Sequence, residues 1–275
     1  GSGGAASLEG PGGQLEGWGL HGAAKMLLAP GRLQLGAPLP QARGNVLEGE
    51  LDGRKVAVKA LPLPGAGAED GPEWQLRRRY TAALQRECAT VLHLTQECHY
   101  VCRYLGIATV GSQLCIAMMR YTSSLTDLVE ESPDGCLPLL QALDIARDVA
   151  RALGELHALG IPALRLCPDN VLATKHGSAV LCNFGLRRAV AVSAAEAGAP
   201  PPQPPAPIEY HFMAPEQVSA PEPSTPGVAP PADIWAFACV FLFMLSGSPP
   251  HAGASVKEIR RTVGAARQAP PLPPW

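Results

Sequence analysis

Neither sign of charge dominates this sequence. Its 22 Lys and Arg residues are nearly balanced by 24 Asp and Glu residues, so the formal net charge at pH 7 is −2. A broad basic field attracts nucleic acid or an acidic membrane surface to a protein, and this chain does not have one. We therefore expect neither nucleic acid nor a membrane among its partners.

A long apolar segment is also missing. The longest apolar run covers residues 234–245. A helix needs about 20 apolar residues to cross a bilayer, so this run predicts a buried core helix instead. No other segment has the pattern of a transmembrane or targeting sequence.

Paired C-x-x-C motifs are absent, although the chain contains eight cysteines. In a sequence without a signal peptide, scattered cysteines are typical of a reduced protein, and we expect a cytoplasmic location. Cys98, His99 and Cys102 have the appearance of half a zinc site, but the four ligands of a structural zinc site are incomplete. Buried free thiols are the simpler interpretation, and no metal site is predicted.

Glycine and proline, with 29 residues each, separate the periodic segments of the chain. Residues 1–30 form a Gly-rich tail. The dipeptide Asp52-Gly53 is a type I′ turn signal between strand formers, so residues 47–61 predict a β-hairpin. Helical periodicity follows over residues 73–96 and, more strongly amphipathic, over residues 138–159.

The other predicted elements are short. They are strands at residues 101–110, 113–119, 170–173 and 179–182, and a helix at residues 256–263. A strand-rich first part followed by a helical second part predicts an α+β protein. We place the two lobes at residues 31–120 and 121–275.

Six short motifs follow one another, each on a predicted element of the matching kind. They are Val56-Ala57-Val58-Lys59, Glu87, the segment 161–170, Asn183-Phe184-Gly185, Met213-Ala214-Pro215-Glu216 and Asp233-Ile234-Trp235. In this order they resemble the V-A-I-K lysine, the αC glutamate, the H-R-D-L-x-x-x-N loop, D-F-G, A-P-E and D-x-W of protein kinases. The style of residues 210–216 is most similar to tyrosine-kinase-like kinases.

This resemblance covers residues 33–275 and implies a bilobal protein-kinase-like fold. A small β-rich N-lobe would precede a mainly helical C-lobe. Since the family continues through further helices after the point where this sequence stops, we expect the C-lobe to be incomplete at the chain end.

Two positions that the resemblance makes catalytic carry unsuitable residues. Phosphoryl transfer needs a carboxylate near the substrate hydroxyl, and Arg165 stands there; a guanidinium cannot accept a proton or a hydrogen bond. The family's main metal ligand is an aspartate, and Asn183 stands there; a neutral amide is a much weaker ligand for Mg²⁺. Asn170 keeps the second ligand position, but one amide rarely holds Mg²⁺ alone. No catalytic residue is therefore intact.

The phosphate-binding loop departs from the family pattern as well. Counted back from Lys59, the last glycine of the loop is kept as Gly44, but the two earlier glycines fall on Leu39 and Gln41 with Pro40 between them. Proline has no N–H group to offer a phosphate, so this loop has fewer donors.

Two further replacements affect the activation segment. Ala163 stands at the H-R-D histidine and should loosen the packing below Phe184, while Leu164 stands at the arginine that reads a phosphorylated loop. Residues 186–208 predict an Ala- and Pro-rich loop with Ser193 as its single hydroxyl. We therefore expect no phosphorylation switch in this segment.

Other parts of the family pattern are retained. The resemblance places Val46, Ala57 and Leu172 around an adenine ring, and it makes Lys59 and Glu87 an ion pair with either a nucleotide-binding or a structural role. Structural roles are implied for Phe184, Gly185, Glu216 and Asp233, the last as anchor of the catalytic-loop backbone. For Arg165, a local pair with Asp169 and a phosphate contact both stay open.

The leading hypothesis is a catalytically inactive kinase fold that binds partner proteins, as a scaffold or allosteric module within a larger assembly. No cofactor is required for this role. ATP binding remains compatible with it and would not need Mg²⁺, because Arg165 and Asn183 make the cleft more positive than the family pattern. The alternative hypothesis is a working protein kinase in which another carboxylate, such as Asp169, acts as the base.

Overall fold

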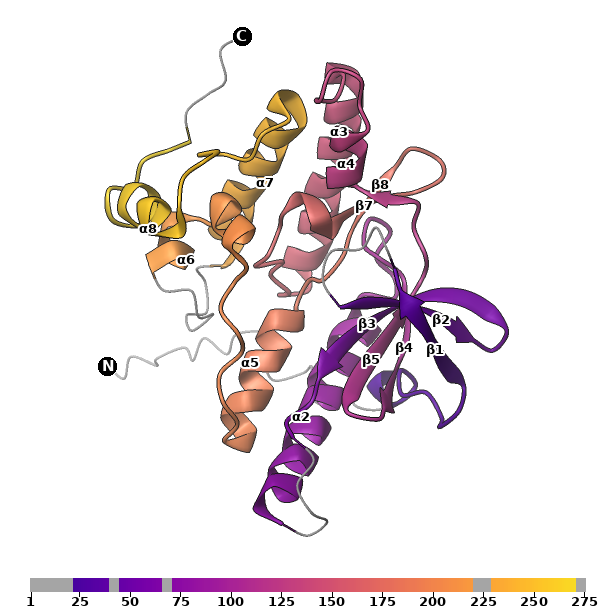
Figure 1. Cartoon of the computed structure of the whole chain (residues 1–275). Helices are drawn as coiled ribbons and strands as arrows, with labels where there is room; N and C mark the ends of the chain where they lie inside the picture. Colours follow the sequence, from indigo (N-terminus) through magenta and orange to yellow (C-terminus); the bar gives the residue numbers. More distant parts are fainter. Residues whose placement is uncertain (1–21, 40–44, 66–70, 220–228, 271–275) are drawn as a thin grey trace, which may run out of the picture.

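The computed structural model describes residues 22–39, 45–65, 71–219 and 229–270. It has two lobes, a β-sheet lobe with one long helix and a mainly helical lobe (Figure 1). This arrangement confirms the predicted α+β, bilobal fold. The predicted phosphate-binding loop, at residues 40–44, lies outside the described residues.

A five-stranded antiparallel sheet forms the N-lobe, in the order β1-β2-β3-β5-β4. Its strands are β1 (Leu33–Pro38), β2 (Val46–Leu51), β3 (Arg54–Pro62), β4 (Tyr104–Val110) and β5 (Gln113–Met118). Asp52 and Gly53 both have positive φ, +50° and +80°, as a type I′ turn requires, so the predicted hairpin is confirmed. Alternate residues of a strand point to opposite faces. Lys59 therefore shares a face with Ala57, which belongs to the main hydrophobic core.

Residues 22–28 also belong to this lobe, although the sequence assigned them to the tail at residues 1–30. The Ile107 N–H donates to the Met26 carbonyl at 2.7 Å, and the Leu28 N–H donates to the Ile107 carbonyl at 2.8 Å. This short segment thus extends the sheet at the free edge of β4. The Gly-rich composition gave no sign of it, because the contact depends on a strand that lies some 80 residues further on.

The long helix of the N-lobe is α2 (Pro72–Leu94), close to the prediction of residues 73–96. Pro72 suits the first turn, where its missing N–H has no helical partner. Residues four apart, Tyr80, Leu84, Cys88 and Leu92, are buried along one face.

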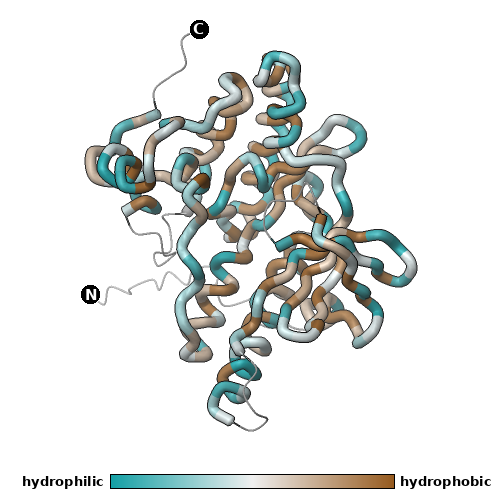
Figure 2. Tube along the Cα trace, viewed as in Figure 1, coloured by the Kyte–Doolittle hydropathy of each residue, from teal (hydrophilic) through white to brown (hydrophobic). Residues whose placement is uncertain are grey.

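The C-lobe is built on α4 (Leu139–Ala158) and α7 (Ala229–Ser246), which pack against each other (Figure 1). Around them are η1 (Pro168–Asn170), η2 (Pro207–Phe212), η3 (Arg260–Ala265), α3 (Leu125–Glu130), α6 (Pro215–Ser219), α8 (Val256–Ile259) and the small sheet of β6 (Ser123–Ser124), β7 (Val171–Ala173) and β8 (Ala179–Leu181). The brown, apolar parts of the trace meet inside both lobes (Figure 2), and one hydrophobic cluster reaches from Leu84 of α2 to Leu153 of α4.

The apolar run at residues 234–245 lies in α7, as predicted. Cys239, Val240 and Met244 are each 1% exposed, whereas Ile234, at its start, is 55% exposed. Among the helices in the described ranges, none is long and apolar enough to cross a membrane.

The prediction of a loop over residues 186–208 is wrong in its first half. Residues 186–197 form a helix, α5 (Leu186–Ala197), which packs along α2. Its composition is rich in alanine, the best helix former, and left-handed glycines bound it on both sides. Gly185 has φ +68° and Gly198 has φ +71°. These are end signals that the Ala- and Pro-rich composition of the whole segment obscured.

Candidate functional site

Lys59 of the N-lobe and Arg165 of the C-lobe lie close enough to interact electrostatically, and we call the region between them the cleft. The backbone on its C-lobe side is held by one buried carboxylate. Asp233 of α7 is 1% exposed, and it accepts hydrogen bonds from the N–H groups of Ala163 (2.9 Å) and Leu164 (2.7 Å). Its Oδ2 atom also lies 2.9 Å from Nε2 of His157. Leu164 has a left-handed φ of +60°, a strained conformation for a branched residue. Asp233 therefore fixes the backbone turn from which Arg165 projects.

Arg165 pairs with Glu209 of η2, where both carboxylate oxygens accept from the same guanidinium nitrogen, Nη2. Asp169, the partner predicted from the sequence, accepts a hydrogen bond from the Thr126 hydroxyl at 2.5 Å. The Nε atom of Arg165 is buried and has no hydrogen-bond partner among the described residues. Glu209 thus offsets the positive charge that Arg165 brings to the cleft.

The two asparagines at the metal-ligand positions bond to each other. Asn183 Nδ2 donates to Asn170 Oδ1 at 2.6 Å, and Asn170 Nδ2 donates to the Arg165 carbonyl at 2.6 Å. The Asn183 N–H donates to the Tyr104 hydroxyl at 3.0 Å, which fixes a residue with φ +59°. The Asn170 oxygen that a cation would need is therefore occupied by an amide donor. The residues present do not fit a Mg²⁺ ion.

Lys59 is the second cation of the cleft. Burial lowers the pKa of its ammonium below the usual value of 10.5, with Cys182, Arg165 and Glu209 as charged or titratable neighbours. Among the described residues, Lys59 forms no ion pair. Its positive charge is therefore less well compensated than that of Arg165.

The expected ion pair between Lys59 and Glu87 is absent. Glu87 instead contacts its neighbour Arg86, with 3.2 Å between Arg86 Nη2 and Glu87 Oε1, and Arg86 also pairs with Glu196 of α5. The cause is the helix α5, which packs against α2 and provides this carboxylate. Gly185, directly before α5, also lies close to α2, because a Cβ atom at this position would be 3.1 Å from the Val91 side chain.

The other residues of the family pattern are placed as follows. Phe184 has no exposed surface and meets Tyr104 edge to face, with ring centroids 5.4 Å apart, and the looser packing expected at Ala163 stays a prediction. Val46, Ala57 and Leu172 all belong to the main hydrophobic cluster, Ala57 as a buried member and the other two as half-buried ones. Glu216 is half-buried in the first turn of α6.

Ser193 lies on the buried face of α5. It is fully buried, and its hydroxyl donates to the Ala189 carbonyl at 2.6 Å. A phosphate at this position would need α5 to leave α2, because a charged group is costly to bury without partners.

The cysteines show no sign of a metal centre. All eight are free thiols, and six of them are buried. Burial raises the pKa of Cys88, Cys102 and Cys167 to about 12, which makes these thiols poor ligands and nucleophiles at neutral pH. No group of three or more His, Cys, Asp or Glu residues that could hold a metal occurs in the described ranges.

Comparison with known proteins identifies the family. The sequence profile described as "Protein kinase domain" matches residues 42–270, which is most of the chain. This match, together with the bilobal fold and the order of the cleft residues, shows that the chain belongs to the protein kinase family.

Several named proteins are similar to this chain. It is 29% identical over 230 residues to the E3 ubiquitin-protein ligase KEG of Arabidopsis thaliana, covering 79% of this chain and 13% of that protein. It is 32% identical over 218 residues to the serine/threonine-protein kinase PknD of Mycobacterium tuberculosis, covering 78% and 30%. It is 27% identical over 207 residues to cyclin-dependent kinase 4 of Ovis aries, covering 74% and 63%. The chain therefore spans less than two thirds of each of these relatives.

Sequence reasoning missed three of the residues that shape the site. Glu209 and Tyr104 bond to Arg165 and Asn183, and Glu196 pairs with Arg86, the neighbour of Glu87. Each of these partners is far away in the sequence. Glu209 directly precedes the tract at residues 210–216 that carried the resemblance, so a search for carboxylates flanking that motif would have found it. Neither of the other two residues stands in a motif.

Proposed function

We propose that this protein kinase domain does not transfer phosphate and functions by binding a partner protein, as a scaffold or allosteric module. The observation that carries the proposal is the hydrogen bond between Asn183 and Asn170, the two positions that hold Mg²⁺ in the family pattern. Phosphoryl transfer depends on metal ions that neutralise the developing charge. Two mutually bonded amides supply no negative charge to hold such an ion.

The position of the base supports the same proposal. Arg165 cannot accept a proton, and its partner Glu209 is already engaged by the guanidinium. Asp169, the carboxylate that could replace the missing base, accepts from the Thr126 hydroxyl of α3. A general base must lie within hydrogen-bond reach of the proton that it removes, and Asp169 is held by α3.

Nucleotide binding without metal is compatible with this function. Lys59 is a buried ammonium with no carboxylate in ion-pair contact among the described residues, and such a group favours an anion as its partner. Val46, Ala57 and Leu172 would enclose the base, as the family pattern implies. Bound ATP would then act as a ligand that shifts a conformational equilibrium, not as a substrate.

Radiolabelled ATP tests the proposal directly. We expect the chain, incubated with Mg²⁺ or Mn²⁺ and generic protein substrates, to incorporate no more phosphate than its Lys59→Ala variant. Relatives named as protein kinases make the working enzyme the competing hypothesis. Incorporation clearly above that of the variant would support the enzyme and end the proposal.

Restoring the two missing carboxylates should not restore turnover. In the double variant Arg165→Asp/Asn183→Asp, the first new carboxylate would face Glu209, and the second would lose the amide donor that now bonds Asn170. The first change places two carboxylates together, and the second places a carboxylate against the Asn170 side-chain oxygen. Each arrangement makes ionisation of the new aspartate more costly. Because catalytic groups act as a unit, we expect transfer to stay at background level. Robust turnover by a folded double variant would show that only these two residues block catalysis.

A further inference from the structure

A run of prolines follows α5, and we call residues 199–207 the proline tract. Its sequence is Ala-Pro-Pro-Pro-Gln-Pro-Pro-Ala-Pro, and its last residue, Pro207, begins η2. Residues 199–206 belong to neither a helix nor a strand. Ala206 has φ −62° and ψ 149°, which are values of a polyproline II helix, and each proline fixes its own φ at about −65°. Composition and backbone therefore both favour a polyproline II conformation.

The burial of the proline tract repeats every third residue. Ala199 and Pro202 are half-buried and Pro205 is buried, whereas the residues between them are exposed. Ala199 packs against the main hydrophobic cluster. A polyproline II helix has about three residues per turn, so residues three apart lie on one side of it. The tract thus rests on the protein by one side and turns its other two sides outwards. One outward side consists of Pro201, Pro204 and Pro207.

Both ends of the proline tract are fixed to the fold. The Ala199 N–H donates to a carbonyl in the last turn of α5 at 2.8 Å. At the other end, the Ala206 N–H donates to Oε2 of Glu209 at 3.2 Å, and the Glu209 N–H donates to the Ala206 carbonyl at 2.9 Å. Between them, Nη1 of Arg187 donates to the Gln203 carbonyl at 3.4 Å. The tract runs along the molecule from the lower end of α5 toward α6 (Figure 1). A segment that is already held extended loses little freedom when it binds.

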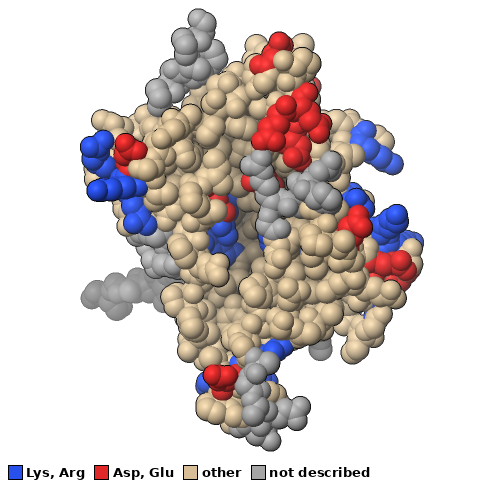
Figure 3. Space-filling view, in the orientation of Figure 1, with Lys and Arg blue, Asp and Glu red and all other residues tan. Residues whose placement is uncertain are grey.

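The proline tract carries no charge. Residues 197–208 contain no Asp, Glu, Lys or Arg. Figure 3 shows few charged side chains on the face along which the tract runs, whereas such side chains gather over α3 and α8. A partner that recognises the tract must therefore use the proline rings and the backbone carbonyls, not ion pairs.

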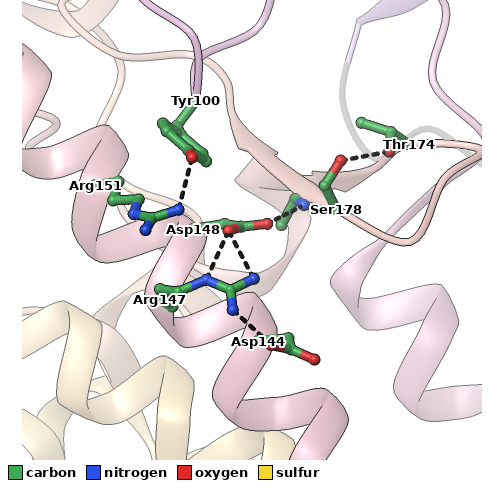
Figure 4. A network of polar contacts seen from close by, with 8 residues as sticks. Tyr100, Asp144, Arg147, Asp148, Arg151, Thr174 and Ser178 are labelled. Atoms are coloured by element: carbon green, nitrogen blue, oxygen red, sulfur yellow. Dashed lines mark hydrogen bonds and ion pairs between the residues drawn. The ribbon is translucent and has the colours of Figure 1, made fainter.

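The arginines of α4 are a weaker candidate for a docking site, because they are engaged within the chain. Arg147 pairs with Asp144 at 2.8 Å and also contacts Asp148, and Arg151 donates to the Tyr100 hydroxyl at 2.7 Å (Figure 4). An acidic segment of a partner would have to compete with these contacts. The outward prolines of the tract are exposed and can be contacted without breaking an ion pair.

We propose that the proline tract is a docking site for a partner domain whose groove is lined by aromatic side chains and binds polyproline II helices. Flat aromatic rings pack on proline rings, and a preformed helix keeps the entropic cost of binding low. The groove would contact the side formed by Pro201, Pro204 and Pro207, because the side that contains Pro205 faces the protein itself. The inference rests on the proposed role as a protein-binding module, since it names one surface for that role.

Domains that bind polyproline II helices serve as probes of the tract. A panel of WW, SH3 and EVH1 domains, each carrying a fluorescent label, is titrated with the full chain and followed by fluorescence anisotropy. We expect at least one domain to bind with a dissociation constant of about 100 µM or lower. Its affinity should change by less than about twofold between low and high salt, because the tract contributes no charge.

Substitutions on the outward side locate the contact. Pro201→Ala/Pro204→Ala should weaken binding of that domain by about tenfold or more, because two rings are lost and the unbound tract gains freedom. Pro201→Leu/Pro204→Leu should weaken it as well, because leucine keeps the apolar surface but does not fix φ. The control Pro30→Ala/Pro133→Ala, at exposed positions outside the tract, should leave the affinity within roughly twofold. Circular dichroism confirms that each variant is folded.

Three outcomes would overturn the docking site. They are a panel in which no domain binds the full chain, an alanine variant that binds as well as the original chain, and a leucine variant that does so. The last result would indicate a general apolar contact in place of polyproline II recognition. Phosphate transfer is measured separately with radiolabelled ATP, so a failure of this inference is distinguishable from a failure of the proposed function.

Discussion

Replacing Glu209 by glutamine is expected to raise the affinity of the cleft for metal-free ATP by about tenfold. Glu209 now engages the Arg165 guanidinium, and an incoming phosphate must compete with it. An ion pair at about 4 Å is worth about 4 kcal/mol at an effective dielectric constant of about 20, before desolvation. Removing the competitor needs to release only about a third of that energy to give a tenfold gain.

Calorimetric titration of ATP in EDTA measures this gain. The control is Asp52→Asn, which removes a carboxylate from the exposed Arg32–Asp52 pair far from the cleft and should leave ATP affinity unchanged. Excess Mg²⁺ should not strengthen ATP binding in either protein, because Mg²⁺-bound ATP presents less negative charge to Lys59 than free ATP does. Binding that appears only with Mg²⁺, or an unchanged affinity in Glu209→Gln, would contradict this account of the cleft.

The same titration should depend on pH in a defined direction. Burial lowers the pKa of Lys59, so the ammonium loses its proton below 10.5 when no ligand is bound. A bound phosphate favours the charged form and raises that pKa again. ATP affinity should therefore fall as the pH rises through the lowered pKa of the free protein. The Lys59→Ala variant should bind more weakly and lose this dependence.

Removing the Asp233 carboxylate is expected to be the most destabilising single change considered for this chain. Asp233→Ala leaves the buried N–H groups of Ala163 and Leu164 without an acceptor. Each unsatisfied buried group costs about 1–3 kcal/mol, so the free energy of unfolding should fall by about 3 kcal/mol or more. Loss of the contact with His157 adds to that cost.

Urea unfolding followed by circular dichroism gives the size of this effect. Asp233→Asn keeps one carbonyl acceptor and should lose less stability than Asp233→Ala. The control Asp144→Ala removes an exposed carboxylate that pairs with Arg147, and exposed pairs of this kind contribute about 0–1 kcal/mol. Equal losses in Asp233→Ala and Asp144→Ala would mean that the catalytic-loop backbone is held by other contacts.

The local parts of the fold were predictable from the sequence, because their signals are local. Asp52-Gly53 specifies a tight turn by its own backbone preferences, and Pro72 marks the start of α2 within one residue. Amphipathic periodicity located α4 for the same reason. The order of the motifs then placed these elements in a known architecture.

The arrangement of the cleft was less predictable, because it depends on packing between distant segments. The Lys59–Glu87 pair was expected from the motifs alone, but the docking of α5 on α2 brings Glu196 to Arg86 and leaves Glu87 beside the same arginine. Glu209, the partner of Arg165, lies 44 residues away in η2, whereas the sequence offered only the nearby Asp169 or a phosphate. Long-range pairs of this kind carry no short-range pattern.

The segment at residues 22–28 has a consequence for how partners can approach the N-lobe. The exposed edge of a β-sheet is a template for a strand from another chain, and proteins that avoid such pairing cover the edge. Here the chain covers its own edge, since Met26 and Leu28 take the N–H and the carbonyl of Ile107 in the middle of β4. A foreign strand could add at β4 only by displacing them. While this segment stays in place, the backbone N–H and carbonyl of Ile107 are unavailable to a strand from another chain.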